Sequence, residues 1–137
     1  MFNRHLQRNN QIPGLTNQQQ TQLHDHIHEA ILWLHHQIQR DWPDGHTTVS
    51  TSICLSGLLA GVARAELRID TLQDCPRSFF LEARVLTPSG GSSSSRWVCA
   101  GNAAVLMRAL AQTQRMQQQV LTALLEGARA IQRHELS

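Results

Sequence analysis

Residues 47 to 56, TTVSTSICLS, decide the fold class of this chain, because the spacing of apolar residues changes there. Val49, Thr51, Ile53 and Leu55 alternate with serines and one cysteine. This alternation is the period of a β-strand with one buried face. The residues before this point follow a helical period instead, and a chain that changes from one period to the other predicts an α+β domain.

The segment before the strand predicts one long helix over residues 17 to 41. Its apolar residues recur at helical spacing and form one stripe: Leu23, Ile27, Ala30, Ile31, Leu34 and Ile38. A capping box at its start is offered by Thr16 with Gln19, or by Asn17 with Gln20. The sequence PDG at 43 to 45 is typical of a turn and ends the helix.

The segments after the strand are less regular. Residues 57 to 70, GLLAGVARAELRID, fit a short helix through Leu58 and Val62, or a strand through Leu67 and Thr71, and we favour the helix. The run SFFLEARVLT at 78 to 87 alternates as a strand, and RWVC at 96 to 99 predicts a second one. Between them, the glycines and serines of PSGGSSSS predict a mobile hairpin loop. A phosphate-binding loop is disfavoured, because the Gly-Lys-Ser or Gly-Lys-Thr ending of such a loop is missing.

The last segment predicts a helix that Asn102 caps and that continues to about His134, roughly 50 Å of helix. Such a length approaches that of a coiled-coil seam. We predict that the seam packs on the first helix and, by one edge, on a second copy of the chain. The predicted interaction residues are Leu106, Leu110, Thr113, Gln117, Val120, Leu124 and Ile131.

The predicted fold is therefore α+β, with a long N-terminal helix and a longer C-terminal helix flanking a small antiparallel sheet of about three strands. Residues 1 to 15 have no periodicity and predict a flexible N-terminal arm. Residues 16 to 137 predict a single α+β domain, since the chain is too short for two comfortable ones.

The composition narrows the environment of the protein. The formal net charge of +2 is too small to indicate nucleic-acid binding by itself. Cys54, Cys75 and Cys99 are widely spaced, and they predict reduced thiols without a disulfide framework. No signal-like run and no apolar stretch of membrane-spanning length is visible. We therefore expect a cytoplasmic protein that does not enter a membrane.

Residues 24 to 36, HDHIHEAILWLHH, hold five of the eight histidines. His24, His28 and His35 fall within about 40° of one another on a helical wheel, beside the apolar stripe. One hypothesis is a divalent metal site, but the Glu of an HExxH motif is missing. Two further interpretations stay open: the imidazoles cover the boundary between core and solvent, or they titrate near pH 6.5 and make the helix acid-sensitive.

No catalytic set can be picked out, and we expect neither enzymatic activity nor a cofactor. The sequence predicts a non-enzymatic protein-interaction module, such as an adaptor, a chaperone-like partner binder or a regulator, dimeric through its C-terminal helix. The alternative is a nucleic-acid-associated regulator that uses arginines of the arm and of the last helix. These arginines are Arg4, Arg8, Arg108, Arg115, Arg129 and Arg133.

Overall fold

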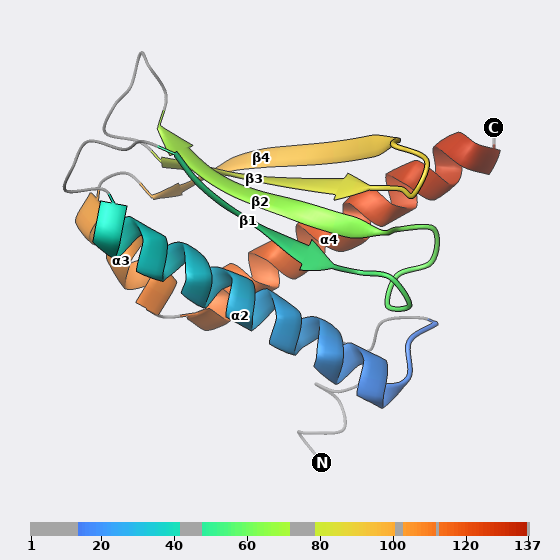
Figure 1. Ribbon diagram of the computed structural model, residues 1–137, viewed down its shortest axis with the longest axis horizontal. Helices are drawn as coiled ribbons and strands as arrows, with labels where there is room; N and C mark the ends of the chain where they lie inside the picture. Colours follow the sequence, from blue (N-terminus) through green and yellow to red (C-terminus); the bar gives the residue numbers. More distant parts are fainter. Residues whose placement is uncertain (1–13, 42–47, 72–78, 101–102, 112, 137) are drawn as a thin grey trace.

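The protein is an α+β domain in which three helices lie on one side of a four-stranded antiparallel sheet (Figure 1). The computed structural model describes residues 14–41, 48–71, 79–100, 103–111 and 113–136. The elements in chain order are α2 (Asn17–Asp41), β1 (Thr48–Cys54), β2 (Arg64–Thr71), β3 (Phe79–Leu86), β4 (Ser92–Ala100), α3 (Ala103–Ala111) and α4 (Thr113–Leu136). The predicted class is confirmed, with four strands in place of about three.

The sheet is a meander, since its spatial order β1-β2-β3-β4 is also the order along the chain. Alternate residues of each strand point toward the helices and form the core with them. In the middle of the sheet these residues are Ala65, Leu67 and Ile69 of β2 with Leu81, Ala83 and Val85 of β3, all nearly fully buried. The opposite face carries no helix among the described residues, so it is open to solvent.

Helix α2 has the predicted bounds and the predicted buried stripe. All six stripe residues are at most 5% exposed. The first of the two proposed capping boxes forms: the Thr16 amide donates to Gln19 Oε1 at 3.0 Å, and the Gln19 amide donates to Thr16 Oγ1 at 3.1 Å. These bonds satisfy amides that a helix leaves unpaired at its first turn.

The helix favoured for residues 57 to 70 is wrong. Gly57 and Gly61 adopt positive φ angles of 79° and 76°, and they bend the chain in a compact turn after β1. The Leu58 and Leu59 amides donate to the Leu55 carbonyl, which closes this turn. From Arg64 onward the alternating residues form β2 instead, because both β1 and β3 pair with it.

The predicted hairpin loop is shorter than the run PSGGSSSS. The Thr87 amide donates to the Gly91 carbonyl at 2.8 Å, and the Gly91 amide donates to Thr87 Oγ1 at 2.9 Å. This turn fixes the register of the hairpin, so the four serines pair with β3 as the first part of β4. The prediction failed because serine has no strong strand preference of its own and neighbouring β3 supplies the pairing.

The single C-terminal helix is also wrong, since α3 and α4 are separate helices. Figure 1 shows that α3 and α4 run in different directions. Both still contribute buried residues to the core, with Leu106 and Leu110 from α3 and Val120 and Leu124 from α4.

Helix α4 crosses the sheet in close contact at Gly127. A Cβ atom added there would lie 2.7 Å from Cγ2 of Val85 and 3.8 Å from the Ser93 carbonyl oxygen. The missing side chain therefore lets the helix backbone approach β3 and β4. The predicted arm, the PDG turn, the Asn102 cap and Cys75 lie wholly or almost wholly outside the described residues.

Candidate functional site: the open face of the sheet and its β4 edge

The open face of the sheet is a lattice of opposite charges. Arg64 lies 3.4 Å from Glu66, and Arg68 lies 3.6 Å from Glu82 and 3.9 Å from Asp70. Arg84 lies 4.0 Å from the same Glu82 oxygen. All these side chains are partly exposed, and such pairs stabilise a fold by only about 0–1 kcal/mol each. The lattice makes this face polar without giving it a strong charge of either sign.

Arg96 differs from the other arginines of this face. Its guanidinium lies 4.9 Å from the centre of the Phe80 ring, a cation–π distance. Glu82 is its partner in the strand register, but the Glu82 carboxylate contacts Arg68 and Arg84. Among the described residues, no carboxylate lies within ion-pair distance of Arg96. A positive charge therefore stands at the edge of the lattice without an acidic partner.

The β4 edge, defined here as the outward side of residues 92 to 98, carries unpaired backbone groups. In an antiparallel pair, the amide and carbonyl groups of alternate residues point toward the neighbouring strand. The Thr87–Gly91 bond shows that the odd-numbered residues of β4 face β3. The backbone groups of Ser92, Ser94 and Arg96 hence point outward, and β4 has no second neighbour in the sheet.

The inner row of β4 is less covered than the inner rows of the other strands. Ser93, Ser95 and Trp97 face the helices but are only half-buried. Within the described part of the chain, the buried Trp97 Nε1 has no hydrogen-bond partner. On the open face, Val98 is 56% exposed. Both sides of the β4 edge therefore present side-chain surface that a neighbouring strand could cover.

The opposite edge is flanked by α2 along its length. The Gln19 side chain donates to the Gly57 carbonyl just beyond the end of β1. Near the start of β1, the Gln37 amide donates to the Ser50 carbonyl at 3.2 Å and accepts from Trp33 Nε1 at 2.8 Å, in the amide orientation that its neighbours require. The helix thus supplies partners to the β1 side of the sheet.

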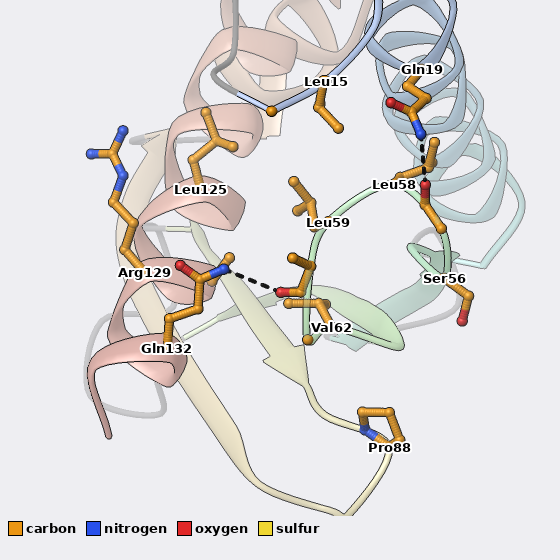
Figure 2. Close-up of a pocket in the computed structure, with 15 residues that line it drawn as sticks. Leu15, Gln19, Ser56, Leu58, Leu59, Val62, Pro88, Leu125, Arg129 and Gln132 are labelled. Carbon is orange, nitrogen blue, oxygen red and sulfur yellow. Dashed lines mark hydrogen bonds between the residues drawn. The ribbon is translucent and has the colours of Figure 1, made fainter. Parts of the chain in front are cut away.

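A hollow of about 620 Å³ lies where the turn after β1 meets the helices (Figure 2). Four leucines from three segments line it: Leu15 ahead of α2, Leu58 and Leu59 in the turn, and Leu125 of α4. Gln132 reaches across from α4 and donates to the Ala60 carbonyl at 3.3 Å. The close-up shows Arg129 directed away from the centre of the hollow. Its polar side chains are thus tethered to the turn or directed outward.

A shallower hollow lies between α2 and the end of β1. Asp25, His26 and Glu29 line it together with Cys54. In the ranges that the structure describes, no three His, Cys, Asp or Glu side chains come together as metal ligands. His24, His28 and His35 are half-buried, as expected for residues beside the apolar stripe. They do not form a three-ligand metal site in this structure.

The predicted interaction seam of the C-terminal segment lies inside the domain. Leu106, Leu110, Val120, Leu124 and Ile131 are at most 6% exposed and belong to the core. Gln117 is half-buried, and the Thr113 side chain lies outside the described set. The apolar seam is therefore occupied by α2 and the sheet, and it offers little surface to a second copy.

The arginines predicted for nucleic acid are dispersed. Arg108, Arg115, Arg129 and Arg133 are all exposed, and Arg4 and Arg8 lie outside the described residues. Arg115 and Arg129 are separated by about 21 Å along α4 at 1.5 Å per residue. Arg133 Nε donates to the Arg129 carbonyl at 3.5 Å near the helix end. Among the four described arginines, the helices thus bring together one pair, Arg129 and Arg133.

The two described cysteines are free thiols in different surroundings. Cys54 is exposed at the end of β1. Cys99 is half-buried at the bulge of β4, where the register shifts opposite Phe79 and Phe80, and its Sγ donates to the Phe79 carbonyl at 3.4 Å. Burial raises the pKa of the Cys99 thiol from 9.0 to about 11, which is the opposite of an activated nucleophile.

Comparisons with known proteins add no assignment: no family model matches the chain, and neither a curated protein nor a solved structure matches it. No described helix is long and apolar enough to cross a membrane.

The sequence reasoning missed the residues of the β4 edge. Ser92, Ser94, Arg96 and Val98 share the open side of one strand, but the serines were assigned to a loop. The sequence gives little signal there, because residues 92 to 95 are four serines. The alternation of exposed and half-buried residues from Ser92 to Cys99 appears only in the structure.

Proposed function

We propose that this chain is a non-enzymatic protein-interaction domain, an adaptor or regulator, that binds an extended segment of a partner protein along the β4 edge. The observation that carries the proposal is the outward row of backbone amides and carbonyls at Ser92, Ser94 and Arg96, which have no partner among the described residues. An added strand would satisfy them as the fifth strand of the sheet.

The sequence of β4 supports this function. Edge strands are commonly protected by proline, by charged side chains or by a covering segment, because an open edge pairs with other chains. Strand β4 spans nine residues without proline, and its one charged residue is Arg96. Its one bulge lies at the far end, beside Cys99. Most of the edge hence has no bulge, and its outward residues are exposed.

The proposal puts the interface on the β4 edge and not on the C-terminal helix, since the seam of that helix packs within the same domain. It also places the protein in the cytoplasm, where Cys54 and Cys99 would stay reduced. To test the location, the protein is taken directly from cells, unfolded and treated with a thiol reagent. We expect both Cys54 and Cys99 to react, and a disulfide at either position would contradict a cytoplasmic location.

A pair of proline variants tests the interface. Ser94→Pro removes an outward amide and blocks strand addition, while the ladder with β3 keeps its bonds. Ser52→Pro makes the matched change on the β1 edge. We expect affinity capture from the native host to retain a partner on the wild type and on Ser52→Pro, and to lose it on Ser94→Pro. Equal retention by all three proteins would refute the proposal.

Hydrogen exchange checks the same point without a substitution. In the free protein, the amides of Ser92, Ser94 and Arg96 should exchange fast and those of Ser93 and Ser95 slowly, because only the latter face β3. In the captured complex the first three should become protected. Unchanged exchange in the complex would show that the partner binds elsewhere.

A further inference from the structure

We infer that the segment bound at the β4 edge carries an acidic residue followed or preceded by two apolar residues, which face Arg96, Trp97 and Val98 in that order. The inference rests on the proposed function and adds the chemistry of the partner. Its three parts come from Arg96, Trp97 and Val98, which are the large side chains of the edge strand β4.

The acidic residue follows from the charge order across the sheet. The register places Ser50, Arg68, Glu82 and Arg96 in one row of the open face. The charges of Arg68, Glu82 and Arg96 alternate in sign along this row. The row ends at Arg96, which forms no ion pair with a carboxylate of the described residues. A residue of an added strand would stand next to Arg96 at a cross-strand distance of about 5 Å. A carboxylate there continues the alternation.

The apolar residues follow from the two positions beside Arg96. Val98 is 56% exposed, and its row includes the half-buried Phe80. An apolar side chain two residues from the acid would cover Val98 on the open face. The intervening side chain points to the inner face, where it would pack beside the half-buried Trp97. Covering such surface is the main source of free energy for strand addition beyond the backbone bonds.

A second copy of this chain does not provide the required chemistry. Strand β4 contains no aspartate or glutamate, and neither does β1, the other edge strand. Pairing of β4 with either edge would leave Arg96 opposite serine, glycine, another neutral residue or a second arginine. The charge complementarity therefore favours a segment of a different protein.

The test uses two labelled nine-residue peptides in which threonines flank the central sequence Val-Val-Glu-Val-Val or Val-Val-Lys-Val-Val. This central sequence presents the same order of residues to β4 in either strand direction. Each peptide is titrated by fluorescence polarisation against the full chain. We expect the Glu peptide to bind about fivefold tighter than the Lys peptide, with a preference that fades as salt rises. Arg96→Gln should abolish the preference. The matched variant Arg84→Gln, one strand further in on the same face, should keep it.

The outcomes separate the two proposals. Equal binding of both peptides, a preference that survives Arg96→Gln, or no binding of either peptide overturns the inference on partner chemistry. If in those cases Ser94→Pro still releases the captured partner, the proposed function stands. If light scattering shows a dimer of the wild type that Ser94→Pro dissociates, a second copy occupies the edge and the inference is wrong.

Discussion

The two edges of the sheet have similar sequences and different surroundings. Both β1, TVSTSIC, and β4, SSSSRWVCA, are rich in small hydroxyl side chains on their open faces. Helix α2 flanks β1 and its Gln37 bonds to the Ser50 carbonyl, whereas no described helix gives β4 a comparable bond. The comparison teaches that an edge is closed by what packs beside the strand and not by the strand alone.

The inward-facing residues of these two strands also differ, in how deeply they are buried. Val49 and Ile53 of β1 are 5% and 3% exposed, while Ser93, Ser95 and Trp97 of β4 are half-buried. The β1 side therefore buries more apolar surface in the core, and the β4 side is the one at which we propose that a partner binds. The four predictions below test this division, in order of decreasing expected effect.

The largest effect is expected where the covered edge meets the core. Ile53→Ala should lower the free energy of unfolding by about 2–5 kcal/mol, because it leaves a cavity under α2. Ser52→Ala, its exposed neighbour, should change the same quantity by about 0.5 kcal/mol or less. Urea unfolding followed by circular dichroism measures both. A loss of similar size in the two variants would mean that α2 does not seal this edge.

The thiols at the two edges should differ in reactivity. Only the thiolate is alkylated, and the raised pKa of Cys99 keeps its thiol protonated at pH 8. Relative to a thiol of the ordinary pKa of 9.0, a pKa of about 11 lowers the thiolate fraction about a hundredfold.

In a Cys75→Ser background, iodoacetamide at pH 8 should therefore label exposed Cys54 first. The Cys99 rate should rise steeply only as the pH approaches 11. Peptide mapping by mass spectrometry follows both sites, and equal rates at pH 8 would show that the β4 bulge is open to solvent.

The third prediction concerns the crossing of α4 over the hairpin of β3 and β4. Gly127→Ala would place a Cβ 2.7 Å from Cγ2 of Val85, and overpacking of this kind costs about 1–3 kcal/mol. It should outweigh the gain of about 1 kcal/mol from replacing a helical glycine. In a Val85→Ala background the same change should become stabilising. A stabilised single variant would show that α4 can shift away from the sheet freely.

The smallest effect is expected at the bond that links α2 to β1. Gln37→Ala removes the bonds to Ser50 and Trp33 and should cost about 1 kcal/mol. The indole proton of Trp33 should also exchange faster in NMR spectra. Gln39→Ala, at an exposed position of the same helix, should change neither property. If Gln37→Ala behaves like this control, the β1 edge is not closed by that contact.

The parts of the fold that could be predicted are those in which one period extends over many residues. The stripe from Leu23 to Ile38 and the alternation in β1 and β3 each have one clean interpretation. The capping box at Thr16 and Gln19 is local and was also found. Residues 57 to 70 fitted both a helical and a strand period. The pairing of β2 with both of its neighbours decided between them, and this pairing involves residues far away in the sequence.

The candidate site could be predicted only in part. Residues 92 to 95 are four serines without any apolar period, and their pairing with β3 depends on the turn between Thr87 and Gly91. The sequence shows apolar residues in the last helix, but not that they would be used inside the domain. A buried stripe is the same in sequence whether it packs on its own domain or on a partner.

The sequence by itself thus determined the α+β class, the first helix and most residues of the core, because burial leaves a period that can be read locally. The tertiary structure alone decided which serine-rich strand is flanked by a helix and which is open. It also decided that Glu82 contacts Arg68 and Arg84 while Arg96 stacks on Phe80. These contacts depend on which helices and strands lie side by side. The spacing of apolar residues in the sequence predicts that a residue is buried, but it does not identify the residue that packs against it.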